Sequence, residues 1–310
     1  MPFPEDLLKN GGLHKATIEW IPKSLPHRRM EKGVYDLPRA TQLVQDIALG
    51  RNPEPRADEN YNLIRELLER DLAPMNLPNN EQKRALQTAL LKPFTLIQGP
   101  PGTGKSVTSA RLAVLYVLMN RQQPPVTNDS DSKKKEKTSP QILYCGPSNK
   151  SVDVVAAYLK RLGHQCPRLV RVYGESIERQ EFPLPNDPTS YKRKSGDATM
   201  DPNLKGIALH HLIRMEGRKH SRQIMEYDEF FRKKPEQVAQ QQVADYLRLV
   251  SQAEAEEIMN AEIILCTASS ASAAKITHSS NVTQIIVDEC GMCTELETLI
   301  KALSNLIPGC

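Results

Sequence analysis

The sequence predicts an α/β protein built on a doubly wound parallel sheet. Short, nearly continuous apolar runs recur along the chain, and such runs are typical of parallel strands that are covered on both faces. Helical segments lie between the runs, and this alternation favours a parallel sheet with helices on each side. Between the first run and the helix that follows it, residues 99–106 form a glycine-rich turn. The carboxyl ends of the strands in such a fold are the expected ligand-binding edge.

The elements follow an N-terminal segment, residues 1–75. Within it, residues 14–25 alternate like a strand and residues 60–72 form an amphipathic helix. The next helix is expected at residues 80–91, with Asn79 or Asn80 as its cap. The apolar runs that predict strands are FTLIQ (94–98), QILYCG (141–146), LVRVYG (169–174), AEIILCTA (261–268) and TQIIVDE (283–289).

Helices are expected between the strands at residues 106–121 and 151–163, and two stretches interrupt the alternation. Residues 122–140 are polar and of low complexity, which indicates a flexible loop, and their KKKEK run is either a solvated loop or a nuclear-localisation patch. Residues 183–260 far exceed the roughly thirty residues of one βα unit, so a helical insertion is expected there. Its basic balance suits either phosphate contacts or a solvated stalk.

Composition narrows the class of protein. The 310 residues carry a net charge of +4, which permits a polyanionic partner without requiring one. Only 5 % of the residues are aromatic, which argues against a nucleic-acid surface dominated by stacking. The longest apolar runs are too short to cross a bilayer, so we expect no membrane span. The scattered cysteines favour a reducing compartment, cytoplasmic or nuclear. Cys290 and Cys293 form a CxxC, which is either a zinc or redox site or a pair of small packing residues.

The glycine-rich turn fits the phosphate-binding pattern G-x-x-x-x-G-K-[ST]. Glycines let backbone N–H groups approach phosphate oxygens, and the start of the following helix favours the same anion. Lys105 supplies a positive charge for the β- and γ-phosphates, and Ser106 supplies a hydroxyl for Mg²⁺. The turn therefore predicts a site for ATP and Mg²⁺, the alternative being a plain Gly/Pro turn. Its residues are Gly99, Pro100, Pro101, Gly102, Thr103, Gly104, Lys105 and Ser106.

An acidic pair follows the last apolar run. Asp288 is expected to hold Mg²⁺, directly or through water, and Glu289 to act as general base on the attacking water. The alternative is an acidic cap for the next helix. Adjacent Asp and Glu favour ATPases that couple hydrolysis to movement.

Polar residues end two other strands. Pro147, Ser148 and Asn149 follow the 141–146 run, and Thr267 ends the 261–268 run with Ser269 and Ser270 beside it. Hydroxyl and amide groups at the carboxyl ends of parallel strands can bond sugar–phosphate oxygens, although polar turns are common in any fold. These residues predict a contact with single-stranded nucleic acid.

Taken in order, these motifs resemble the first RecA-like domain of superfamily 1 helicases. The resemblance is to the branch with the regulator of nonsense transcripts, the DNA2/NAM7 helicases and the zinc-finger-domain helicases, and it covers about residues 75–300. The run VDECGMCTELETLI looks closest to the large zinc-finger helicases described as nuclear-receptor coactivators. The motifs that carry the resemblance are Gln82, QGPPGTGKS, CGPSNKSVD, the helical insertion, ILCTAS and IIVDECGM.

The resemblance implies an ATP-dependent RNA or DNA helicase with a RecA-like P-loop domain at residues 76–310. Residues 1–75 would be the end of an accessory domain and its stalk helix. Gln82 would read the adenine, and Asp288 with Glu289 would be motif II. Residues 147–149 and Thr267 would contact the backbone of single-stranded RNA or DNA.

Two departures from the family pattern stand out. Leu296 occupies a position where the family usually has proline, and the chain ends at Cys310, before the expected Gly-Asp motif and the second RecA domain with its arginine fingers. The resemblance therefore implies a fragment or truncated isoform that binds ATP and hydrolyses it poorly alone. One alternative is a non-enzymatic scaffold or transcriptional coactivator, with protein partners in transcription or RNA decay. Another is an AAA-type ATPase, which the helical insertion disfavours.

Overall fold

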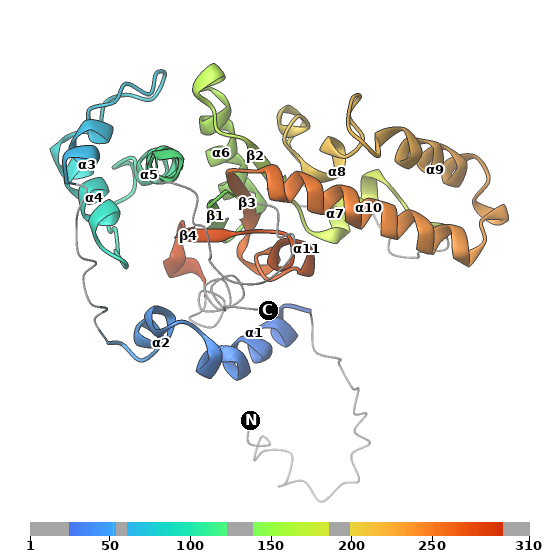
Figure 1. The fold of residues 1–310 in the computed structure, drawn as a ribbon, viewed down its shortest axis with the longest axis horizontal. Coiled ribbons are helices and arrows are strands. Elements are labelled where there is room, and N and C mark those ends of the chain that lie inside the picture. Colours follow the sequence, from blue (N-terminus) through green and yellow to red (C-terminus); the bar gives the residue numbers. More distant parts are fainter. Residues whose placement is uncertain (1–24, 52, 54–60, 123–138, 186–198, 294–310) are drawn as a thin grey trace, which may run out of the picture.

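The strands form one parallel sheet (Figure 1). The computed structural model describes residues 25–51, 53, 61–122, 139–185 and 199–293. The sheet has the order β2-β3-β1-β4, and all of its pairings are parallel, as the sequence predicts. The strands are β1 (Gln141–Gly146), β2 (Leu169–Val172), β3 (Ile263–Thr267) and β4 (Val282–Val287).

Helices separate the strands, and short 3₁₀ turns join several of them. The α-helices are α1 (Leu25–Asp36), α2 (Gln42–Ala48), α3 (Tyr61–Leu68), α4 (Asn80–Leu91), α5 (Lys105–Gln122), α6 (Asn149–Lys160), α7 (Glu175–Glu181), α8 (Leu209–Leu212), α9 (Ser221–Lys233), α10 (Gln240–Asn260) and α11 (Ala274–Thr277). The 3₁₀ turns are η2 (Leu37–Arg39), η3 (Gly163–Gln165), η5 (Pro202–Leu204), η6 (Pro235–Gln237), η7 (Ala268–Ser270) and η8 (Cys290–Met292). Among the described helices, none is both long enough and apolar enough to cross a bilayer.

The predicted strand at residues 94–98 is wrong. The chain there belongs to no strand, and Phe94 and Leu96 are exposed. A strand needs a neighbour to pair its backbone groups, and the pairing of β4 within the described part of the chain is with β1. The glycine-rich turn is therefore preceded by an unpaired segment, of which Ile97 packs against the core.

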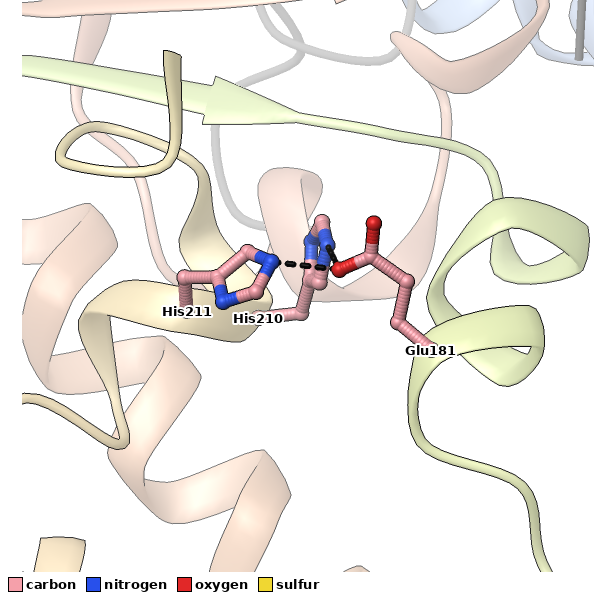
Figure 2. Close-up of side chains that lie close together, drawn as sticks. All are labelled: Glu181, His210 and His211. Carbon is pink, nitrogen blue, oxygen red and sulfur yellow. Dashed lines mark hydrogen bonds and ion pairs between the residues drawn. The ribbon is translucent and has the colours of Figure 1, made fainter. Parts of the chain in front are cut away.

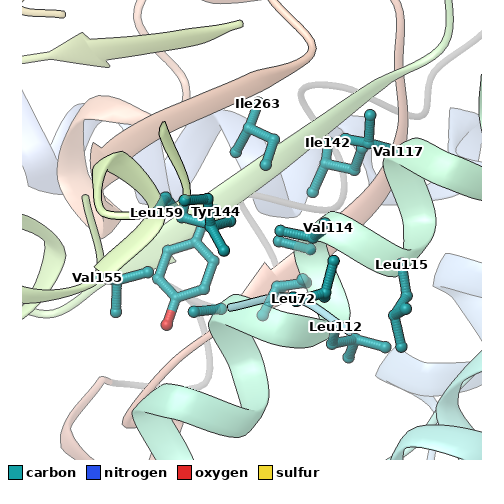
Figure 3. Close-up of a cluster of buried hydrophobic side chains, with 14 of the residues drawn as sticks. Leu72, Leu112, Val114, Leu115, Val117, Ile142, Tyr144, Val155, Leu159 and Ile263 are labelled. Carbon is teal, nitrogen blue, oxygen red and sulfur yellow. The ribbon is translucent and has the colours of Figure 1, made fainter. Parts of the chain in front are cut away.

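One face of the sheet packs against helices from the N-terminal half of the described chain. Tyr144 and Ile142 of β1 meet Val114 and Val117 of α5, and Leu159 of α6 completes the contact (Figure 3). Helix α3 joins the same core, because its apolar stripe is buried in this cluster. The end of the predicted N-terminal segment, from Ile64 to Met75, thus contributes to the core on this face of the sheet.

The other face is covered by the predicted helical insertion. Leu143 and Cys145 of β1 share a buried cluster with Leu209 of α8 and with Ile258 of α10. Helix α10 runs from α9 back to β3, so its C-terminal part is the crossover that returns the chain to the sheet. Helices α8–α10 and helices α3–α5 accordingly lie on opposite sides of the strands (Figure 1).

Several sequence predictions lie outside the described residues. They include the strand-like run at 14–25 except its last residue, the KKKEK patch within 122–140, the start of the insertion at 186–198, and Leu296. The helices predicted at residues 106–121 and 151–163 correspond to α5 and α6, whereas α3 ends at Leu68, four residues before the end of the helix predicted at residues 60–72. The α4 bounds agree with the predicted residues 80–91, and Asn79 is its cap.

A buried histidine of α8 makes the stability of the fold depend on pH. Burial, followed by the positive charges of His211 and Arg214, lowers the pKa of His210 to about 3. The unfolded chain binds this proton near pH 6.5, so between about pH 6.5 and 3 the unfolded state carries more protons than the folded state. The groups that face the ring are Arg171 of β2, Glu181 of α7, His211 of α8, Arg214 just after α8, and Lys275 of α11.

We expect the free energy of unfolding to fall as the pH drops through this window, by about 1.4 kcal/mol per pH unit from this group alone. Urea titrations at a series of pH values, with a chelator present, measure the slope. The slope should be shallower in His210→Asn and unchanged in the exposed His164→Asn. Equal slopes for wild type and His210→Asn would contradict the prediction.

Candidate nucleotide site and nucleic-acid edge

The glycine-rich turn requires glycine at three positions, two for their backbone conformation and one for lack of space. Gly102 and Gly104 both have φ of +81°, a conformation that other residues rarely adopt. A Cβ on Gly99 would lie 2.8 Å from the Thr103 hydroxyl, which itself donates to the Pro100 carbonyl at 2.8 Å. The backbone is thus shaped as a tight cradle, and the residues fit a phosphate group that approaches the main chain.

Lys105 and Gln82 are held against this cradle. The Lys105 ammonium donates to the carbonyls of Gly99 at 2.8 Å and Pro100 at 2.9 Å. The Gln82 amide donates to the Thr103 carbonyl at 3.0 Å, while its oxygen accepts from the backbone of Asn79 in the cap of α4. The structure therefore brings both predicted residues to the turn, with the lysine folded over the loop that it is expected to serve.

Asp288 is tied to the first turns of α5 through Tyr144. The Tyr144 hydroxyl donates to Asp288 Oδ2 at 2.8 Å and lies 2.7 Å from the hydroxyl of Ser109. Because Tyr144 gives its one hydroxyl proton to Asp288, Ser109 donates to Tyr144. The Ser106 carbonyl, 3.0 Å from the Ser109 hydroxyl, is an alternative acceptor for that same proton. Two hydrogen bonds thus join the predicted metal carboxylate to Ser109, three residues after the residue that is expected to share the metal with it. This donor set of carboxylate and hydroxyl oxygens suits Mg²⁺.

Tyr144 is a positioning residue that sequence reasoning missed. Burial, together with the Asp288 carboxylate, holds its pKa well above the usual value, so the phenol keeps its proton and donates it. The signal in the sequence is a hydroxyl-bearing aromatic in an otherwise apolar strand, and a buried tyrosine usually has a hydrogen-bond partner.

Tyr144→Phe tests this role. The substitution keeps the ring in the core but removes the bond to Asp288, worth about 1 kcal/mol, so Mg²⁺-dependent ATP binding should weaken about fivefold. Isothermal titration with ATP at several Mg²⁺ concentrations measures the change. Tyr158→Phe, on α6, is the matched control. ATP affinity equal to that of the wild type at limiting Mg²⁺ would rule the role out.

Glu289 has an unusual backbone. Its φ of +50° and ψ of 39° lie in the left-handed region, and it is the one non-glycine residue with positive φ in the described part of the chain. Its N–H donates to Asp288 Oδ1 at 3.1 Å. Strained residues are concentrated at functional sites, where surrounding contacts hold them. Glu289 is the N-cap residue of η8, but its side chain makes no cap hydrogen bond.

Strand register brings the other predicted residues to the same edge of the sheet. Gly146 at the end of β1 pairs with Thr267 at the end of β3, and Cys145 pairs with Val287 of β4. The turn after β1, the end of β3 and Asp288 therefore line one edge, with β1 between the other two strands.

The turn after β1 has structural duties of its own. Ser148 caps α6 by accepting from the N–H of Ser151 at 3.2 Å. The Asn149 side-chain oxygen accepts from Arg171 at 2.9 Å, and Arg171 also donates to Asp153 at 2.7 Å. Arg171 and Asp153 were missed by sequence reasoning, although an arginine inside the apolar run LVRV signals a buried partner.

The other residues that are predicted to contact nucleic acid, Thr267 and Pro147, are buried or half-buried. Thr267 is buried, and its hydroxyl lies 3.0 Å from that of Ser270 and 3.3 Å from that of Ser269. Pro147 is half-buried, whereas Lys150 beside it is exposed at the start of α6. Cys290 and Cys293 flank η8 and are half-buried.

Known proteins share this arrangement of motifs. A family model described as AAA domain (AAA_11) matches residues 78–306. The chain belongs to this family. It lies in the superfamily 1 helicase branch that contains the regulators of nonsense transcripts, and the described fold is that of the first RecA-like domain.

The relatives differ in size and in name. The chain is 38 % identical to human "3'-5' exoribonuclease HELZ2" over 96 % of its own length and 10 % of that protein. It is 34 % identical to "ATP-dependent helicase upf1" of Schizosaccharomyces pombe over 53 % of its length and 16 % of the relative. "Regulator of nonsense transcripts 1" of Caenorhabditis elegans is 29 % identical over 77 % and 18 %. The chain thus covers between a tenth and a fifth of the length of each of these relatives.

Proposed function

We propose that this chain is the ATP-binding first motor domain of an ATP-dependent helicase, which couples ATP hydrolysis to movement on single-stranded nucleic acid. The observation that carries the proposal is the pair of hydrogen bonds that connects Asp288 through Tyr144 to Ser109, near the start of α5. It joins a carboxylate from the end of β4 to a phosphate-type cradle far away in the sequence. This combination serves phosphoryl transfer, in which positioning and charge stabilisation do most of the work.

Each predicted residue has a role in this proposal. The backbone of residues 99–106 would hold the phosphates, with Lys105 leaving its two loop carbonyls to bind the β- and γ-phosphates. Ser106 and Asp288 would hold Mg²⁺, which supplies neutralisation of the charge that develops on the phosphate oxygens. Glu289 would orient the attacking water and accept its proton. Gln82 would contact the adenine from α4.

The nucleic acid would follow the carboxyl edge of the sheet. Residues 147–149 and Thr267 lie at adjoining strand ends there, and the exposed Lys150 adds a cation for a phosphate. Relatives named for nonsense transcripts and for exoribonuclease activity support RNA as the strand, and a cytoplasmic or nuclear location. Single-stranded DNA is the alternative substrate, and the binding tests compare it with RNA.

Lys105→Ala tests the nucleotide site. A charged hydrogen bond contributes about 1.5–3 kcal/mol, so ATP·Mg²⁺ should bind about 10- to 150-fold more weakly. The rise in melting temperature with added ATP measures the affinity through ligand linkage. The exposed Lys92→Ala is the control, and circular dichroism checks that the loop variant is folded. ATP binding that survives Lys105→Ala unchanged would overturn the assignment.

Lys150→Ala tests the nucleic-acid edge. Fluorescence anisotropy with a labelled single-stranded RNA should show weaker binding, and the slope of log affinity against log salt should decrease by about 1 because one phosphate contact is lost. A single-stranded DNA of the same sequence runs in parallel. Lys205→Ala, an exposed lysine of the insertion, is the matched control. An unchanged salt slope in Lys150→Ala would remove this lysine from the proposed path.

A further inference from the structure

A cluster of two histidines and a glutamate lies away from the nucleotide site. Glu181 ends α7, and the adjacent His210 and His211 belong to α8 (Figure 2). Both imidazole rings point toward the Glu181 carboxylate: His211 Nε2 hydrogen-bonds to Oε2, and His210 Nε2 lies 3.4 Å from the same oxygen. One ligand atom from each of the three residues falls within 4.8 Å of the others.

His210 has no hydrogen-bond partner. Its residue is 2 % exposed, and both ring nitrogens are buried and make no hydrogen bond, although Nε2 lies 3.4 Å from Glu181 Oε2. A buried polar group without a partner costs about 1–3 kcal/mol, and such groups in native structures usually indicate a missing water or ion. The unsatisfied Nε2 faces the carboxylate, so the missing partner belongs between the two.

The nearby positive charges are already paired, so they do not exclude a cation. Arg214 donates to Asp228, Lys275 bonds Glu178 and Glu254, and Arg171 bonds Asp153. Among the described residues, the ion pairs of Glu181 are with the two histidines. Its negative charge therefore remains directed at the imidazoles. The half-exposed Glu181 also opens the cluster to solvent, which gives an ion a way in.

We propose that Glu181, His210 and His211 bind a divalent metal ion of the zinc class. Two imidazole nitrogens and one carboxylate oxygen form a donor set that zinc uses with a fourth position left for water. Bonds of about 2.0 Å in a tetrahedral site separate two ligand atoms by ~3.3 Å. The His210–Glu181 separation of 3.4 Å meets this spacing. His211 must move outward slightly as it exchanges its hydrogen bond for a metal bond.

The site would cross-link α7, which precedes the insertion, to α8 within it. Helix α7 follows the edge strand β2, and α8 packs on that strand, so an ion held by residues from both helices would fasten the insertion beside the edge of the sheet. Metal that binds only the folded chain raises its stability by mass action. This site is independent of the nucleotide chemistry.

Zinc binding is measured on the full chain that carries Cys290→Ser and Cys293→Ser, which removes the competing CxxC pair. Equilibrium dialysis against Zn²⁺ with elemental analysis should give one equivalent bound, and the melting temperature should rise with Zn²⁺. Glu181→Gln and His211→Ala should each weaken binding at least ~10-fold. The exposed His164→Ala should bind as the parent chain does.

Cobalt(II) gives a second readout that a purely structural ion pair would not produce. A tetrahedral nitrogen and oxygen site should show visible absorption on Co²⁺ addition, lost in His211→Ala and displaced by Zn²⁺. Circular dichroism confirms that the variants are folded, which is expected because Glu181 and His211 are only partly buried. The proposal is overturned by less than one bound equivalent at micromolar Zn²⁺, or by folded Glu181→Gln and His211→Ala variants that bind like the parent.

Discussion

Glu289→Gln is expected to lower ATP turnover by about 10²- to 10⁴-fold, the usual contribution of a general base, while ATP binding is retained. The amide keeps the size of the side chain and the left-handed turn at residue 289, but it cannot accept a proton from water. Its backbone bond to Asp288 is unaffected, because the donor is the main-chain N–H. The variant therefore separates chemistry from binding.

Phosphate release in the presence of single-stranded RNA measures turnover, and the ATP-dependent rise in melting temperature measures binding. The exposed Glu236→Gln, in η6, is the matched control and should turn over ATP like the wild type. A folded Glu289→Gln chain that hydrolyses ATP at the wild-type rate would contradict the assignment of the base. Loss of both turnover and ATP binding would contradict it as well, since it would indicate a collapsed site.

Arg171→Met is expected to lower the free energy of unfolding by about 3–5 kcal/mol, because it leaves the buried Asp153 carboxylate without its charge partner. Arg171 is fully buried in β2, donates to Asp153 and to the Val172 carbonyl at 2.8 Å, and covers the Tyr173 ring at 4.0 Å. The Tyr173 hydroxyl donates to the same Asp153 oxygen. The network therefore joins β2 to the start of α6.

Urea denaturation measures the loss, with Arg248→Met as the control because that arginine forms an exposed pair expected to contribute no more than ~1 kcal/mol. The double variant Arg171→Met, Asp153→Asn should recover part of the loss, since it removes the uncompensated charge. A loss below 1 kcal/mol in Arg171→Met would show that the pair is not a main support of this edge.

The same network links stability to the proposed nucleic-acid edge. Arg171 donates to the side-chain oxygen of Asn149, so the amide of that residue is fixed by a bond from the edge strand β2. A substitution at Arg171 should therefore weaken RNA binding as well as lower the free energy of unfolding. Lys150→Ala should weaken RNA binding without lowering the free energy of unfolding. The two variants together separate the support of the edge from the contact itself.

Much of the fold could be predicted because strands and helices have local periodicities. Four of the five predicted strands are present, and α4 has the predicted bounds. The failure at residues 94–98 has a different cause. Their apolar, β-branched composition suits a strand, but strand formation requires a paired neighbour, and periodicity cannot supply that information. The insertion was likewise recognised as helical, whereas its role in covering the sheet depends on packing.

The glycine-rich turn and the acidic pair could be recognised in the sequence, because backbone freedom at Gly102 and Gly104 and the charges of Lys105 and Asp288 depend on residue type and spacing. The hydrogen bonds of Tyr144 to Ser109, 35 positions away, and to Asp288, 144 positions away, are visible in the folded structure alone. The same is true of the burial of His210 without a hydrogen bond beside Glu181. Hydrogen bonding and burial between distant residues depend on how the layers pack around the sheet, which no local pattern encodes.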